Sequence, residues 1–144
     1  MQTDKKPSIS VVICTYNREK FIGDVLNCLA KQTFSADLFE IIVVDNNSTD
    51  RTPVLVKEFI QATPGLPVSY VFEKNKGLSF ARNRGLEEAN GAIITYLDDD
   101  AEPIPVFLTS IQNFLQENKE AVGIGGKVIP KYSESKEPAW MNKY

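Results

Sequence analysis

The chain has 144 residues, of which 42% are hydrophobic, so its length and composition suit one domain with a substantial core. The formal net charge of −3 excludes a general electrostatic attraction for nucleic acid or an anionic membrane. The sequence shows neither a signal peptide nor an apolar run of the ~18 residues that a membrane-spanning helix needs. Because Cys14 and Cys28 both fall among apolar residues, we expect them in the core of a soluble protein from a reducing, cytoplasmic compartment.

The first half of the chain predicts two strands, each followed by a helix. A strand at residues 8–14 leads, past the candidate helix cap Asn17, into apolar residues spaced three and four apart. A second strand at residues 41–44 precedes a helix that starts around Thr52 and Pro53, where proline suits the first helical turn. The inward faces of the two helices comprise Phe21, Val25, Leu26, Leu29, Leu55, Val56, Phe59 and Ile60.

The second half continues this alternation, which is typical of an α/β fold with a parallel sheet flanked by helices. A strand at residues 68–72 precedes a helix over residues 77–89, where Ala81, Gly85 and Ala89 form a small ridge that permits close packing on the sheet. The remaining elements are a strand at 92–97, a helix that follows Pro103 and Pro105 and presents Leu108, Ile111 and Leu115, and a short strand at 122–124. We assign one domain to residues 1–130, and a loosely held tail or an element without its packing partner to residues 131–144.

Three consecutive carboxylates, Asp98, Asp99 and Asp100, follow the strand at residues 92–97. They repel one another and no neighbour in the sequence neutralises them, so they must take up protons, spread into water or bind a cation. In an extended segment Asp98 and Asp100 would share one side, and their oxygen ligands suit a hard divalent cation. A solvated acidic turn is the alternative, but ligands of open α/β sheets bind beyond the carboxyl ends of strands. We therefore expect a cation site here.

The loops after the other strands would converge on the same edge of the sheet. Tyr16, within the polar segment 15–17, offers a flat face for a nucleobase, although it could equally cover the core. Asp45 and Asn46 suit a tight turn, but their polar groups could also bind the edge of a base. Arg82 would by default be solvated surface, yet a guanidinium near a sheet edge can reach a phosphate.

Four stretches, residues 10–18, 43–50, 77–83 and 91–100, together resemble glycosyltransferase family 2 and its Rossmann-like GT-A fold, with a mostly parallel sheet flanked by helices. The resemblance implies an inverting, metal-dependent transfer of a sugar from a nucleoside-diphosphate-sugar donor to a hydroxyl of a glycan, lipid or other acceptor. The cofactor would be Mn²⁺ or Mg²⁺, because both suit an all-oxygen site. Residues 1–130 would then be the donor-binding domain, and residues 131–144 the start of a missing acceptor-binding half.

The same resemblance implies a role for each candidate site residue. Asp100 would hold the metal on the donor diphosphate and Asp99 the ribose, while Asp98 fills the first position of the family's Asp-any-Asp motif. The other donor-binding candidates are Thr15 and Asn17, Tyr16 against the nucleobase, Asp45 and Asn46 at the base edge, and Arg82 in support of the donor site.

Two features depart from the family pattern. Where many relatives with a uridine donor carry a second acid, this chain has Asn46, whose amide both donates and accepts and need not read the same base. The family takes its general base from a later acidic residue, but Glu134 and Glu137 stand in the polar tail and are poor candidates, so no base is assigned. An imidazole base is excluded because the chain contains no histidine.

Two hypotheses from other classes of protein remain open. One is a non-catalytic module that binds a nucleotide sugar without transferring it. The other is a receiver domain of signalling, which also has a parallel sheet and clustered acids. A receiver needs an acidic pair after its first strand and a lysine near the end of its last, where this chain has residues 15–17 and 125–127.

Overall fold

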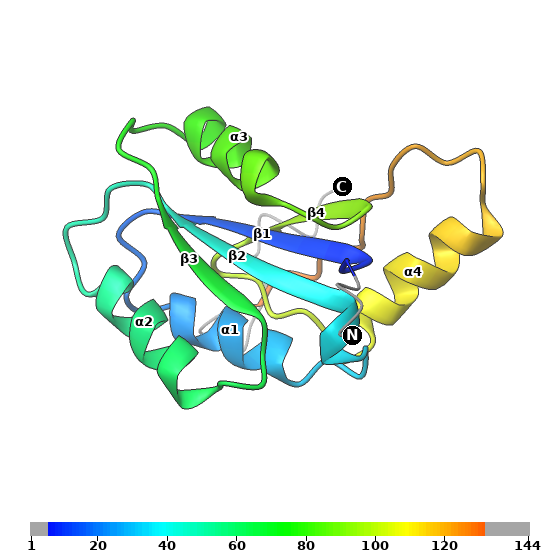
Figure 1. Ribbon diagram of the computed structural model, residues 1–144, viewed down its shortest axis with the longest axis horizontal. Coiled ribbons are helices and arrows are strands. Elements are labelled where there is room, and N and C mark those ends of the chain that lie inside the picture. The colour runs from blue at the N-terminus through cyan, green and yellow to red at the C-terminus, as the bar shows by residue number, and fades with distance from the viewer. Residues whose placement is uncertain (1–5, 132–144) are drawn as a thin grey trace, which may run out of the picture.

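The computed structural model describes residues 6–131 and shows an α/β fold with a fully parallel sheet, which confirms the predicted fold class (Figure 1). Within that range the four strands lie in the order β3-β2-β1-β4, so that β1 and β2 form the centre of the sheet. The strands are β1 (Ile9–Thr15), β2 (Phe39–Asp45), β3 (Val68–Phe72) and β4 (Ile93–Asp98). The helices are α1 (Ile22–Ala30), α2 (Thr52–Ala62), α3 (Leu78–Glu88) and α4 (Phe107–Glu117), with a 3-10 turn at Ala36–Leu38.

Helices cover both faces of the sheet, and α3 lies on the face opposite α1 and α2 (Figure 1). Alternate residues of the central strands point to opposite faces: Val11 and Ile13 pack toward α1, α2 and α4, whereas Val12 packs toward α3. All three side chains are fully buried. Burial on both faces explains why β1 carries apolar residues at the consecutive positions 11–14 rather than at alternate ones.

The small ridge predicted on α3 lets this helix lie unusually close to the sheet. A Cβ built on Gly85 would stand 2.3 Å from Cγ1 of Val12, well inside any real contact, and Ala81 is fully buried against the same strands. The position of α3 matters for the site because the helix begins at the carboxyl edge of the sheet, beside the ends of β1 and β2.

Several predictions of detail were wrong. Residues 122–124 form no strand, and Val122 is completely exposed, because a three-residue apolar run has no neighbouring strand to pair with there. Asn17 does not cap α1, which begins at Ile22 after Phe21; Asn17 instead adopts a left-handed backbone with φ 52°. Phe21, predicted on the inward face of this helix, directly precedes it and is 43% exposed.

Other predictions were confirmed, held only in part or lie beyond the described range. Thr52 begins α2 and Pro53 occupies its first turn, as predicted. Cys14 and Cys28 are half-buried free thiols rather than fully buried residues. The predicted tail lies outside the described residues, apart from Lys131. Among residues 6–131 no helix has both the length and the apolar character to cross a membrane.

Candidate donor site

An open cavity of about 570 Å³ lies at the carboxyl edge of the sheet, where β1, β2 and β4 end within one residue of each other in register. It is bounded by β1 and the loop after it, the end of β2, the start of α3 and the turn after β4. The lining residues are Cys14, Thr15, Tyr16, Arg18, Asn46, Lys76, Gly77, Leu78, Ala81, Asp98, Asp99 and Asp100. Six of the nine candidate residues from the sequence therefore meet in one cavity, since Asn17, Asp45 and Arg82 are not among these described lining residues.

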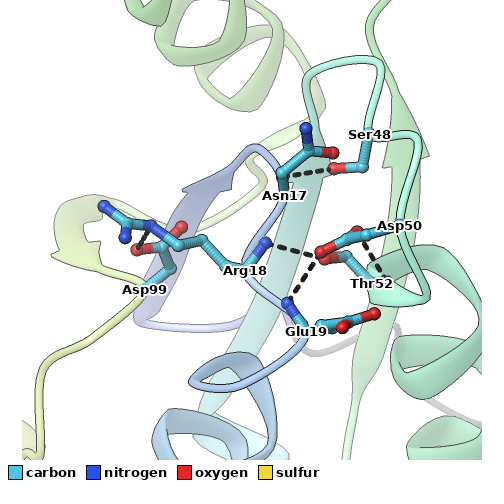
Figure 2. Close-up of polar contacts among 7 residues, drawn as sticks. All are labelled: Asn17, Arg18, Glu19, Ser48, Asp50, Thr52 and Asp99. Atoms are coloured by element: carbon cyan, nitrogen blue, oxygen red, sulfur yellow. Dashed lines mark hydrogen bonds and ion pairs between the residues drawn. The ribbon is translucent and has the colours of Figure 1, made fainter.

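The acidic triplet divides into one buried and two exposed carboxylates. Asp99 is 8% exposed, whereas Asp98 and Asp100 are open to the cavity. Contrary to the expectation that nothing neutralises the cluster, Nε of Arg18 lies 3.3 Å from Oδ1 of Asp99 (Figure 2). Burial raises the pKa of Asp99, an effect that the Thr15 hydroxyl and Arg18 oppose and the neighbouring carboxylates reinforce.

Thr15 places a buried hydroxyl in the cavity wall. The residue is 2% exposed, and its Oγ1 lies beside the Asp99 carboxylate without a well-formed hydrogen bond to any described residue. A buried hydroxyl in this state is a group that a ligand can satisfy.

The acidic residues of the cavity suit a cation that a bound ligand helps to coordinate. Among residues 6–131, no three His, Cys, Asp or Glu side chains converge as a metal site. A hard divalent cation does not need such a cage, because Mg²⁺ commonly binds one or two carboxylates together with substrate phosphates and water. The exposed Asp98 and Asp100 carboxylates offer this kind of oxygen donor set beside a space large enough for a ligand.

Tyr16 and Lys76 form another part of the cavity wall. Tyr16 is 45% exposed, and Nζ of Lys76 lies 5.0 Å from the centre of its ring and 3.2 Å from its hydroxyl. A cation therefore already sits on one face of the ring that was predicted to stack on a base. Lys76 and Arg18 also line the cavity but were not among the site residues predicted from the sequence, although each is a basic residue in a loop shortly after a strand.

Asp45 is buried and stabilises the turn after β2 instead of lining the cavity. It is 1% exposed, and its two oxygens accept hydrogen bonds from the Tyr70 hydroxyl at 2.6 Å and the Ser48 N–H at 3.0 Å. Burial, together with the hydrogen bond to Asp45, raises the pKa of Tyr70. Contact between Asp45 and a nucleobase remains a sequence prediction that this geometry does not support.

Asn46, the next residue, lines the cavity, but its side chain forms hydrogen bonds within the protein. It is 6% exposed, and its Nδ2 donates to the carbonyl oxygens of Asn75 at 2.6 Å and Glu73 at 3.4 Å. Its Oδ1 accepts the N–H of Gly77 at 2.7 Å. The side chain thus joins the end of β2 to the segment between β3 and α3.

The loops after β1 and β2 are held together by hydrogen bonds from backbone N–H groups to side-chain oxygens (Figure 2). The N–H of Asn17 donates to Ser48 Oγ, that of Arg18 to Thr52 Oγ1 and that of Glu19 to Asp50 Oδ2, all at 2.9–3.0 Å. Burial raises the pKa of Asp50, but hydrogen bonds from Thr52 and from backbone N–H groups outweigh it and hold the pKa below its usual value. These bonds fix the segment that carries Tyr16 and Arg18.

Arg82 lies outside the main cavity. Its guanidinium carbon is 5.8 Å from the centre of the Tyr96 ring, and its carbonyl oxygen accepts the Tyr96 hydroxyl at 3.2 Å. It lines a small neighbouring hollow with Leu78 and Asp98. Its predicted support of a donor stays a prediction.

A parallel α/β sheet with a polar cavity beyond the carboxyl ends of its strands defines a ligand-binding domain of the nucleotide-binding type. Residues 10–142 match the family described as Glycosyl transferase family 2. The chain belongs to this family.

Relatives and solved structures agree with the assignment. The chain is 36% identical over 101 residues to glycosyltransferase AglE of Haloferax volcanii, which covers 70% of this chain and 33% of that protein. It is 35% identical over 128 residues to the poly(ribitol-phosphate) beta-N-acetylglucosaminyltransferase TarS of Staphylococcus aureus, covering 85% of this chain and 22% of TarS.

Two solved structures share the fold and were obtained with donors. The mannosyltransferase PcManGT of Pyrobaculum calidifontis, in complex with GDP-Man and Mn²⁺, superposes with a TM-score of 0.73 at 32% identity, over 76% of this chain and 32% of that one. TarS 1-349 of S. aureus with UDP-GlcNAc gives a TM-score of 0.71 at 29% identity, over 89% of this chain and 38% of that one. The chain thus spans between about a fifth and two fifths of the length of these proteins.

Proposed function

We propose that this chain is the donor-binding part of a glycosyltransferase that moves a sugar from a nucleoside-diphosphate-sugar donor to an acceptor hydroxyl. The observation that carries the proposal is the cavity at the strand ends, which the exposed residues Asp98 and Asp100 line together with an exposed aromatic ring and two cationic side chains. An aromatic face suits a base, and carboxylates with a metal suit a diphosphate. GDP-Man and UDP-GlcNAc in the two similar structures support this class of donor.

In this proposal Asp100 holds a divalent cation, Mn²⁺ or Mg²⁺, together with the donor diphosphate. When bound, the cation stabilises negative charge that develops on the diphosphate as it leaves the sugar. Asp99, held in place by Arg18, accepts a hydrogen bond from a ribose hydroxyl, and the Thr15 hydroxyl lies beside it. Tyr16 stacks on the base, and the Lys76 ammonium that now lies on its ring is within the same cavity as the phosphates.

The reaction class is an inverting displacement at the anomeric carbon, in which the acceptor hydroxyl attacks and loses its proton to a carboxylate. None of the described residues is assigned as that base, and Glu134 and Glu137 lie outside the described range. We therefore propose that the chain by itself binds the donor. The two free thiols, Cys14 and Cys28, fit the further proposal of a cytoplasmic location.

A receiver domain is disfavoured by the same site. After β1 the cavity wall presents Thr15 and Tyr16 instead of a pair of acids, and residues 125–127 belong to no strand.

Calorimetric titration with UDP and GDP, with and without Mn²⁺, tests the donor assignment. Asp100→Ala should weaken Mn²⁺-dependent binding roughly tenfold or more, since even outer-shell partners of a metal are worth that much. Glu102→Ala is the matched control, because Glu102 is an exposed acid two residues away that pairs with Lys131. Equal Mn²⁺-dependent affinity in parent and Asp100→Ala, with unchanged circular dichroism, would refute the metal role of Asp100.

A further inference from the structure

We propose that Asn46 is a positioning residue of the donor site, which fixes the segment 73–77, and with it Lys76 and the start of α3, against the cavity. This inference rests on the proposed function, because the ligand is taken to be a nucleoside diphosphate. It also replaces the expectation that the Asn46 amide, which can both donate and accept, contacts the edge of the base.

The hydrogen bonds of Asn46 leave it little capacity for a ligand. A primary amide has two N–H donors and an oxygen that accepts twice. Both donors are used, on the carbonyls of Asn75 and Glu73, and the oxygen already accepts from Gly77. One lone pair of Oδ1 is left, so the side chain has no N–H to offer a base. The backbone N–H of Asn46 is also engaged, on the Thr15 carbonyl at 2.8 Å.

The segment that Asn46 holds is otherwise exposed. Residues 74–80 all lie at the surface, yet Lys76, Gly77 and Leu78 line the cavity. Gly77 has φ 138° and ψ 137°, a backbone conformation that L side chains rarely adopt, and its N–H points at the Asn46 oxygen. The 2.7 Å bond to Gly77 and the 2.6 Å bond to Asn75 together place the residues on either side of Lys76.

Lys76 and the first turn of α3 therefore depend on a buried side chain from the loop after β2. Removing the amide would free the Asn75 carbonyl and the Gly77 N–H, which can then turn to water and carry Lys76 away from Tyr16. Such a loss changes the shape of the cavity as a whole. We expect it to weaken the binding of all nucleotides by a similar factor. Loss of a contact that recognises the base would instead change the ranking of their affinities.

The neighbouring residue offers a matched control. Asn47 also bonds this segment, through Nδ2 to the Lys74 carbonyl at 3.3 Å, but it is not one of the described residues that line the cavity. Asn47→Gly removes the same amide one position along and, unlike alanine, suits the left-handed φ of 67° at this position. Asn46→Asp and Asn47→Asp add the same charge at the two positions. In Asn46→Asp a carboxylate oxygen would face the Asn75 carbonyl, so two acceptors repel each other while the Gly77 bond is kept.

The test uses the 144-residue chain and two measurements. Amide hydrogen exchange of the ligand-free protein, followed by NMR, reports whether the Gly77 N–H is protected. Calorimetry with UDP and GDP in the presence of Mn²⁺ gives the affinities and their ratio. In Asn46→Ala we expect Gly77 to exchange roughly tenfold faster and both dissociation constants to rise by a similar factor, the value of one hydrogen bond. Asn47→Gly should change either measurement less than about twofold on the same scale.

Two results would overturn the inference while the proposed function stands. One is an unchanged exchange rate of Gly77 in Asn46→Ala, which would show that the amide does not hold the segment. The other is a change in the ratio of UDP to GDP affinity, which would return Asn46 to base recognition. If the parent chain binds neither nucleotide, the proposed function fails instead, and with it the positioning of a donor.

Discussion

Replacement of Gly85 by alanine tests the close approach of α3 that shapes the cavity. The new Cβ would lie 2.3 Å from Cγ1 of Val12 and 3.3 Å from Cγ2 of Val44, where ordinary contacts begin at 3.4 Å. Val12 and Val44 are fully buried, and β-branched side chains have few rotamers to retreat into. Either the helix or the strand must therefore move by about 1 Å, given the usual packing density of protein interiors.

The magnitude follows from two opposing effects. Extra methyl groups in a packed core cost about 1–3 kcal/mol, and the depth of this overlap favours the upper part of that range. Alanine in place of glycine inside a helix stabilises the folded state by about 0.5–1 kcal/mol. We expect the free energy of unfolding to fall by about 1–2 kcal/mol when the two effects are combined.

Urea unfolding followed by circular dichroism measures this change, with Gly23→Ala as the control. Gly23 is also in a helix, α1, but a Cβ there meets nothing within 4 Å, so this variant should be as stable as the parent or up to about 1 kcal/mol more stable. Because Leu78 and Ala81 of α3 line the cavity, Gly85→Ala should also weaken UDP or GDP binding. A Gly85→Ala protein as stable as the parent would refute the reasoning.

Three further outcomes are expected. Tyr16→Ala should cost roughly 1–3 kcal/mol of nucleoside diphosphate affinity if the base stacks on the ring, as calorimetry would show, and unchanged affinity would place the base elsewhere. Burial raises the pKa of Cys14 from 9.0 to about 11, so in a Cys28→Ser variant alkylation of Cys14 by iodoacetamide should still accelerate above about pH 10, where the thiolate fraction of an ordinary thiol is nearly complete and its rate levels off. The chain should release nucleoside diphosphate from a sugar donor only slowly, since a missing general base typically costs about 10²–10⁴-fold; turnover at ordinary rates that depends on added acceptor would contradict this.

The elements of the fold could be predicted largely from local pattern. The continuous apolar runs of β1 and β2 and the three- and four-residue spacing in α1 and α4 follow from residue type alone, and the structure has strands and helices there. The run at 122–124 shows where such reasoning fails. Its apolar residues permit a strand, but a strand forms only where a neighbour accepts its hydrogen bonds, and local sequence does not specify that neighbour.

The sequence by itself determined that polar residues would gather at one edge of a parallel sheet, because parallel strands end on the same side and each is followed directly by its polar loop. Only the tertiary structure decided which of those groups face the cavity. Asp45 turns to Tyr70, and the Asn46 amide to Gly77, through partners 25 and 31 positions away in the chain. Asp98 and Asp100 stay open while Asp99 is buried against Arg18. Whether a polar side chain is free for a ligand depends on partners brought near by folding, and neighbouring residues in the sequence do not reveal them.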